Sequence, residues 1–377
     1  MPRRTVLVTI LATLLLLGAC GPADDGGTAF GEAELDQAVT DVTTDLEELG
    51  VSFEGELALA ALASFPGFSV VAPDPVPPPV AGTLSLRHVR PSQAASLPRG
   101  IRAWDGDTFT WVEVAPSDDL VLRWSFLDAE EAEHHAEMVV DWGETDQVSD
   151  FEGFGFEVPT AMNVTLTVDA TLEVGSVDAE FDWYSASACP GGILEPVRVY
   201  VDGSLGVGAT LLLDAISFEI APATGSDAQM AFAGRVVASA GADSAGLQWD
   251  VTVNGPLTRE PNCFFRDFEP ESGAVDVRLF STKASDTSSF HLALTFDDVV
   301  WNDPAGNSVD LDGDLTVDGS AVVSFSGTLD DEDADGIPGD NLDLVFANGD
   351  STTLEDFIES RIEATAATAM RVLSLFR

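Results

Sequence analysis

The sequence predicts a mainly β protein: a large, curved antiparallel sheet, open or partly closed into a barrel-like form, with helices near the N-terminal and C-terminal ends. Two observations predict this fold class. Apolar and polar residues alternate with a period of two over much of the chain, which is typical of strands with one buried and one wet face. Near both ends the spacing changes to three and four, the period of one helix face. The apolar stripes of the helices need a face to pack against, and the sheet supplies it.

Strands are predicted where the alternation is clear and is bounded by Gly, Asp or Asn turns. The longest alternation runs from Val164 to Val174 and is interpreted as one strand. Further strands are predicted at residues 197–201, 247–253, 275–279, 290–296 and 309–317. Residues 151–352 therefore form the main antiparallel sheet. A small β meander at 100–150 precedes it, with a turn at Asp105-Gly106-Asp107.

The helices are predicted on both sides of this β region. Residues 30–73 form a helical segment with two parts: an apolar stripe from Leu35 to Leu49, and a run rich in Ala and Leu from Glu54 to Ser64. A helix at 353–377 closes the chain, with Thr353 as its cap. Its apolar positions are Phe357, Ile358, Ile362, Val372, Leu373 and Phe376.

The composition is globular but strongly acidic. The 377 residues include 65 Asp and Glu against 16 Lys and Arg, for a net charge of -49, while 45% of the residues are hydrophobic. Nucleic acids bind to positively charged protein surfaces, so this negative net charge excludes them as partners. We interpret the acidity as a solvated coat, since a single sign of surface charge keeps a protein soluble. Cation binding or adaptation to high salt is the alternative.

The first twenty residues have the pattern of an export signal. Arg3 and Arg4 precede an apolar run from Val6 to Leu17, which is too short to span a bilayer and typical of a signal-peptide core. The run ends in Leu17-Gly18-Ala19-Cys20, which resembles the lipobox of bacterial lipoproteins: an aliphatic residue, two small ones and a cysteine.

That resemblance implies a signal peptide at 1–19, cleavage before Cys20, a diacylglycerol on its thiol and usually a further acyl chain on its new amino group. Residues 20–29 would then be a lipidated tether. The resemblance also implies a location in the bacterial cell envelope, anchored to a membrane by lipid and facing the periplasm or the cell exterior. Two or three acyl chains give stable anchoring where a single chain does not.

Two cysteines remain after lipidation, Cys189 and Cys263. Because an even number of cysteines in an exported chain is typical of disulfide bonds, we predict a bond between them. The alternative is two free buried thiols.

Residues 74–99 combine a Pro-rich linker with a basic strap. No acidic residue lies between Asp74 and Asp105, and five basic residues stand there: Arg87, His88, Arg90, Arg99 and Arg102. With so acidic a body, we interpret them as a strap that lies against the protein itself. A patch for an anionic partner, such as an envelope polysaccharide, is the alternative.

A short acidic loop gives the clearest prediction of a metal site. The stretch from Asp331 to Asn341 contains Asp-x-Asp-x-Asp-Gly, which resembles the calcium loops of EF-hands and thrombospondin type 3 repeats. The resemblance implies calcium ligands at Asp331, Asp333, Asp335, the Ile337 carbonyl and Asp340. It departs from the EF-hand at the twelfth position, where Leu342 replaces the bidentate Glu. An acidic hairpin tip is the alternative, and Asp310, Asp312 and Asp314 are interpreted as the wet face of a strand.

Catalytic motifs are missing from the sequence. It contains no His-x-x-x-His pair, no Cys-x-x-Cys pair and no Gly-x-Ser-x-Gly elbow. His134 and His135 are adjacent, so in a strand they point to opposite faces and do not share a metal. The sequence therefore predicts a non-enzymatic lipoprotein with a binding or structural role and an unidentified protein or envelope partner. The alternatives are a carrier that holds an apolar ligand between sheet and helices, and a hydrolase.

Overall fold

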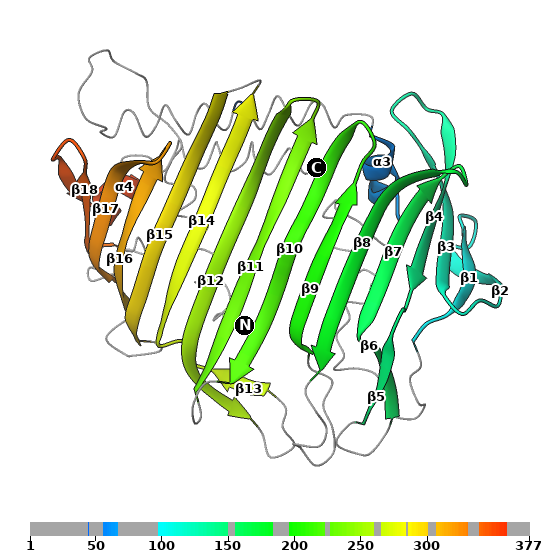
Figure 1. Ribbon diagram of the computed structural model, residues 1–377, viewed down its shortest axis with the longest axis horizontal. Coiled ribbons are helices and arrows are strands. Elements are labelled where there is room, and N and C mark those ends of the chain that lie inside the picture. Colours follow the sequence, from blue (N-terminus) through cyan, green and yellow to red (C-terminus); the bar gives the residue numbers. More distant parts are fainter. Residues whose placement is uncertain are drawn as a thin grey trace. The chain divides into compact units, whose positions relative to one another are not determined.

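A computed structural model describes Thr44 and residues 56–66, 97–149, 155–183, 196–222, 227–259, 265–283, 286–300, 307–330 and 339–359. The protein is mainly β, with antiparallel sheet and a helix near each end, so the predicted fold class is confirmed (Figure 1). The chain divides into two compact units: unit 1 comprises 1–52, 241–255 and 270–377, and unit 2 comprises 53–240 and 256–269. One boundary between the units, after Gly255, falls inside strand β12 (Asp243–Arg259).

Unit 2 contains a sheet in which pairing follows the order β2, β1, β3, β4, β7, β8, β9, β10, β11. Its strands are β1 (Gly100–Asp105), β2 (Thr110–Ala115), β3 (Leu120–Leu127), β4 (Glu133–Asp141), β7 (Ala161–Val168), β8 (Leu172–Trp183), β9 (Pro196–Leu205), β10 (Ala209–Pro222) and β11 (Asp227–Ala240). Two short pairings accompany it: β5 (Thr145–Ser149) with β6 (Gly155–Pro159), and β13 (Phe265–Phe268) with the end of β12. All of these pairings are antiparallel except β1 with β3. The chain reverses once between β1 and β2 and again between β2 and β3, so β1 and β3 run in the same direction.

Unit 1 contains a wholly antiparallel sheet in the order β12, β14, β15, β16, β17, β18, β19. Its strands are β12 (Asp243–Arg259), β14 (Ser272–Lys283), β15 (Asp286–Val300), β16 (Ser308–Val317), β17 (Ser320–Leu329), β18 (Asn341–Phe346) and β19 (Ser351–Thr353). Within the described residues β2 pairs only with β1, and β19 only with β18, so neither sheet closes on itself.

The predicted single strand from Val164 to Val174 is wrong, because the chain reverses there. β7 ends at Val168 and β8 begins at Leu172. Asp169 and Ala170 both have positive φ, 52° and 64°, as a tight hairpin turn requires. Asp tolerates this conformation, and Asp169 is also held by the backbone N–H of His135, at 3.0 Å from Oδ1. The apolar–polar alternation continues through the turn, which is why periodicity did not reveal it.

Helix α3 (Leu57–Ala63) packs on β3, β7 and β8 of unit 2 and confirms the predicted helical run there. Ala58 and Ala61 are completely buried, and these small side chains let the helix approach the sheet closely. Phe65, just beyond the helix, meets the Trp124 ring edge-on at 5.1 Å between centroids. In the stripe predicted at 35–49, the structure describes Thr44 alone, which is helical.

Both ends of α3 are fixed by polar contacts to the sheet. Glu56, the residue before the helix, accepts backbone N–H groups of the β9–β10 turn, at 3.1 Å from Gly208 and 2.7 Å from Ala209. At the other end, Trp124 Nε1 donates to the Ala61 carbonyl at 3.1 Å, where the last turn of the helix leaves carbonyls unpaired. The helix is thus held in one position along the sheet.

One face of the unit 1 sheet is apolar and buried. Leu344, Phe325, Gly313, Leu294 and Val275 are register partners across five neighbouring strands, β18 to β14. All four side chains of this row are buried. Residues that alternate with them are mainly Asp, Ser and Thr, so this sheet has one apolar and one polar face, as the alternation predicts.

Helix α4 (Leu354–Glu359) lies within the predicted C-terminal helix, of which residues 360–377 lie outside the described residues, and it packs on β18 and β19. Thr353 caps it: the backbone N–H of Asp356 donates to Thr353 Oγ1 at 3.2 Å, as the sequence predicts. Among the described residues, no helix is both long enough and apolar enough to cross a membrane.

Candidate functional site

Most of the predicted site residues lie outside the described residues. These are Cys20, Cys189, Cys263, Asp331, Asp333, Asp335 and Ile337. Asp340 is described, directly after Gly339. The base of the predicted calcium loop is a hairpin: the Gly339 N–H donates to the Asp330 carbonyl at 2.7 Å, and Asn341 Nδ2 donates to the Asp330 carboxylate at 3.0 Å. The loop therefore connects β17 to β18, and calcium binding there stays a prediction.

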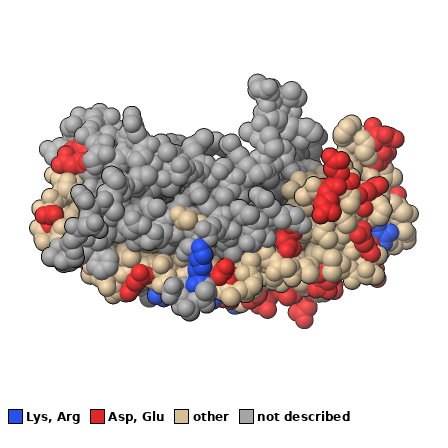
Figure 2. Space-filling view, turned by 90° about the horizontal axis from the view of Figure 1, so that it is seen from above, with Lys and Arg blue, Asp and Glu red and all other residues tan. Residues whose placement is uncertain are grey.

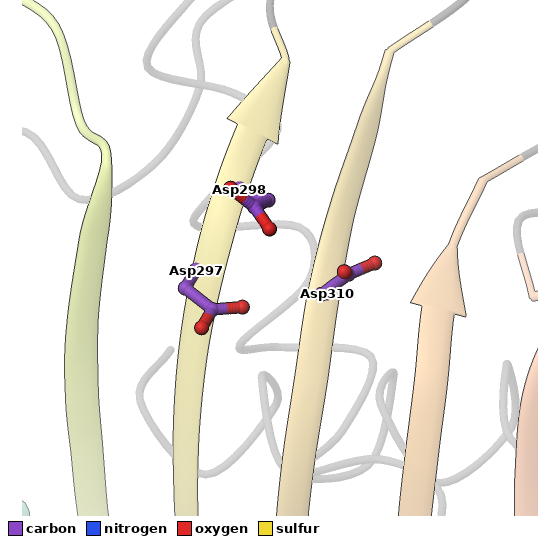
Figure 3. A group of neighbouring side chains, drawn as sticks. All are labelled: Asp297, Asp298 and Asp310. Carbon is purple, nitrogen blue, oxygen red and sulfur yellow. The ribbon is translucent and has the colours of Figure 1, made fainter.

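A second acidic group lies at the bulge in the pairing of β15 with β16. Carboxylate oxygens of Asp297, Asp298 and Asp310 lie within 4.8 Å of one another, with the first two on β15 and the third on β16 (Figure 3). The register shifts between Asp297 and Val300, and Asp298 has a φ of 47°, so two consecutive carboxylates approach the same neighbour. Thr328 Oγ1 donates to Asp310 Oδ1 at 2.7 Å.

Oxygen ligands of this kind suit a hard cation such as calcium, which takes six to eight of them. Three exposed carboxylates supply part of such a shell, and similar groups are common on acidic surfaces that hold no ion. Sequence reasoning interpreted Asp310 as surface and overlooked Asp297 and Asp298. The adjacent pair at the end of a strand was the available signal, but only the bulge brings it to Asp310.

His134 contacts a carboxylate with each of its two ring nitrogens. Its Nδ1 lies 2.8 Å from Asp169 Oδ2, and its Nε2 lies 3.0 Å from Asp128 Oδ2. Its ring stacks on Phe126 at 5.5 Å, and its side chain is only 18% exposed. Asp128 follows β3 and Asp169 follows β7, so one imidazole joins two hairpin turns of unit 2. We call His134, Asp128 and Asp169 the histidine clamp.

The clamp shifts the pKa of each member. Hydrogen bonding to Asp169, and then to Asp128, raises the pKa of His134 above its usual 6.5. The backbone N–H of His135, and then the His134 ring, lower the pKa of Asp169 from its usual 3.8. Bonding to His134, and then to the Ala132 N–H, lowers that of Asp128. At neutral to mildly acidic pH these shifts favour an imidazolium that donates from both ring nitrogens.

We expect the clamp to stabilise unit 2 most strongly between about pH 4 and 6.5. The His134 contribution is complete below the unfolded-state pKa of about 6.5 and is lost as pH rises through its higher folded-state pKa. The Asp128 and Asp169 contributions are present above about 4 and are lost as pH falls through their lowered values. NMR titration of the His134 imidazole should give a pKa above 6.5.

Two variants test the origin of this shift. Asp169→Asn should lower the His134 pKa, because it removes the largest cause of the shift. Asp276→Asn is the matched control, since Asp276 contacts His291 at 2.8 Å and not the clamp. Equal His134 pKa values in the two variants would contradict the clamp.

His135 forms a different contact, with its cross-strand partner Ser125. Ser125 Oγ lies 2.9 Å from His135 Nδ1. A hydrolase would need a carboxylate on the imidazole of such a pair, to orient the ring and stabilise its charge. Asp169 instead accepts the backbone N–H of His135 and holds the ring of His134. The two imidazole rings thus have separate partners, in keeping with the expectation that adjacent residues in a strand point to opposite faces.

On the face seen in Figure 2, Asp and Glu side chains are spread over the described surface, with few Lys or Arg side chains among them. Arg99 of the predicted basic strap pairs with Glu157 on β6 at 2.7 Å. Beside it, Trp142 Nε1 donates to the Pro98 carbonyl at 2.9 Å. At its described end the strap therefore lies against the body of unit 2, while Arg87, His88 and Arg90 lie outside the described residues.

No protein-family model, no curated protein and no solved structure matches this chain.

Proposed function

We propose that this chain is a lipid-anchored envelope lipoprotein of a bacterium, with a non-catalytic binding or structural role outside the cytoplasm. The lipobox-like Leu17-Gly18-Ala19-Cys20, after an apolar run of signal-peptide length, carries the proposal. The anchor is the acylated Cys20, and the acidic β body projects from the membrane on the tether. The contacts of the described histidines support a non-catalytic body, because they link turns and strands and do not converge on one reacting position.

Replacing Cys20 tests the anchor directly. In cells supplied with labelled palmitate, the wild-type protein should carry the label and sediment with membranes. Cys20→Ala should lose the label and appear in the soluble fraction or as the unprocessed precursor. Cys189→Ala is the matched control and should keep both the label and the membrane location. A Cys20→Ala protein that is still cleaved, labelled and membrane-bound would contradict the proposal.

A disulfide between Cys189 and Cys263 fits the same oxidising location. Closing so long a loop stabilises the native state by about 4 kcal/mol in the chain-entropy description. Peptide mapping without reduction should recover the two cysteines in one linked peptide pair, and reduction should lower the melting temperature. Recovery of both thiols as freely alkylated in unreduced, denatured protein would exclude the bond.

A second candidate role is transport of an apolar ligand between sheet and helices. The observation that favours it is the buried apolar face of unit 1, which is lined with Leu, Val and Phe side chains. A carrier would leave room beside this face, whereas a structural protein would fill it. Native mass spectrometry of the purified protein distinguishes the two, because a carrier should retain a lipid of defined mass.

A further inference from the structure

The apolar face of unit 1 is more extensive than the described helix that packs on it. Buried side chains extend from β14 to β18, including Val277 at 3%, Leu292 at 6% and Phe346 at 4% exposure. Among the described residues, α4 packs on β18 and β19 at one edge of this sheet. A single sheet layer would expose these side chains to water, at a cost of about 25 cal/mol for each Å² of apolar surface. The face therefore needs a cover, which another segment of the chain, a bound ligand or a second copy of the chain could supply.

The C-terminal sequence continues the apolar spacing of the helix that already packs on this edge. Leu354, the first residue of α4, is 3% exposed. From it, apolar residues recur at spacings of three and four in one stripe: Leu354, Ile358, Ile362, Ala366, Ala369, Leu373 and Phe376. Ala367, Arg371 and Ser374 fall on the opposite side of the same helical projection. The stripe is small in its middle, where alanines permit close approach to a sheet.

The length and charge of this segment also fit the face. Residues 360–377, which lie outside the described residues, would extend about 27 Å as a helix. Five strands from β18 to β14 are separated by four intervals of about 4.8 Å, or about 19 Å in all. The segment contains three Arg and one Glu, in a chain whose net charge is -49. Its charge is thus complementary to the acidic body.

We propose that residues 360–377 continue α4 as an amphipathic helix that crosses the apolar face of the unit 1 sheet from β18 towards β14. The side chains of this helix cover the surface that a carrier would leave open for a ligand. This assignment is independent of lipid anchoring, because it concerns a face formed by strands of unit 1 and a segment of the same unit.

Two alanines give a matched test in the full-length mature protein. Ala369→Asp places a carboxylate in the centre of the stripe, and Ala367→Asp places the same group on the opposite side of the helix. We expect Ala369→Asp to lower the melting temperature by at least about 4 °C and to increase binding of an apolar fluorescent dye. Ala367→Asp should change the melting temperature by less than about 1 °C and should leave dye binding equal to that of the wild type within error. Equal effects of the two variants, or no effect of either, would overturn the proposal.

A photo-cross-link identifies what covers the apolar face without placing a charge in the stripe. Phe376→p-benzoylphenylalanine retains an aromatic side chain, and we expect it to cross-link to a peptide within residues 272–346 of the same chain. The same probe at Ser374, on the opposite side, should give several-fold less of this product. Cross-linking to a lipid would show that a ligand covers the face, and a product of twice the chain mass would show that a second copy does. Either result would overturn the proposal while leaving the Cys20 experiment unaffected.

Discussion

Gly313→Ala should lower the free energy of unfolding of unit 1 by about 2–3 kcal/mol. Gly313 lies in the middle of the buried row on β16, with Phe325 opposite it on β17 and Leu294 on β15. A Cβ atom there would lie 2.4 Å from the Ala293 carbonyl oxygen, 2.7 Å from Phe325 Cζ and 2.9 Å from Leu294 Cα. Two of these neighbours are backbone atoms of the adjacent strand, so moving the Phe325 ring does not relieve the clash. The pairing of β15 with β16 must also shift.

The expected loss is measured by chemical denaturation against a matched glycine. Gly106, in the β1–β2 turn, has no atom within 4 Å of an added Cβ. Gly106→Ala should therefore change the free energy of unfolding by less than about 0.5 kcal/mol, or raise it slightly by restricting the unfolded chain. If the two alanines have the same effect, the close packing of Phe325 over Gly313 is incorrect.

Trp124→Ala should cost unit 2 about 3–5 kcal/mol, the largest effect expected for a single core residue there. The Trp124 side chain is 4% exposed and lies between the sheet and α3. Its loss removes the packing against Phe65 and the indole N–H bond to the Ala61 carbonyl. Because the helix is short, we expect it to leave the sheet in this variant, and limited proteolysis at 56–66 should then accelerate.

Two further variants separate packing from hydrogen bonding. Trp124→Phe keeps a large ring but loses the indole N–H donor. The lost hydrogen bond should lower the free energy of unfolding by about 1 kcal/mol beyond the effect of the smaller ring, and α3 should stay protected from proteolysis. Trp142→Ala makes the same deletion at a partly exposed indole that bonds the Pro98 carbonyl, and it should cost less than Trp124→Ala. If Trp124→Ala costs less than about 1 kcal/mol, α3 contributes little to the core.

The sequence alone determined the fold class, the positions of several strands, among them β12, β14, β15 and β16, and the cap of the last helix, but it did not single out β10, β11, β17 or β18. These properties depend on local patterns: alternation predicts a strand with two different faces, and Thr353 before a helical stripe predicts its own bond to Asp356. Local pattern failed at Asp169 and Ala170, because an alternation of period two is unchanged when the chain reverses through a three-residue turn that pairs Val168 with Leu172. Positive φ at these residues decided that β7 and β8 form a hairpin.

Tertiary structure decided which distant residues meet. His134 was visible as one histidine among acidic residues, but its two carboxylate partners come from turns after different strands. Asp297 and Asp298 approach Asp310 only because β15 bulges beside β16. Strand register and bulges depend on the packing of the whole buried face, so no local pattern specifies them. The predicted lipid attachment at Cys20 is the opposite case, because a processing enzyme recognises a short linear motif and the motif is complete in the sequence.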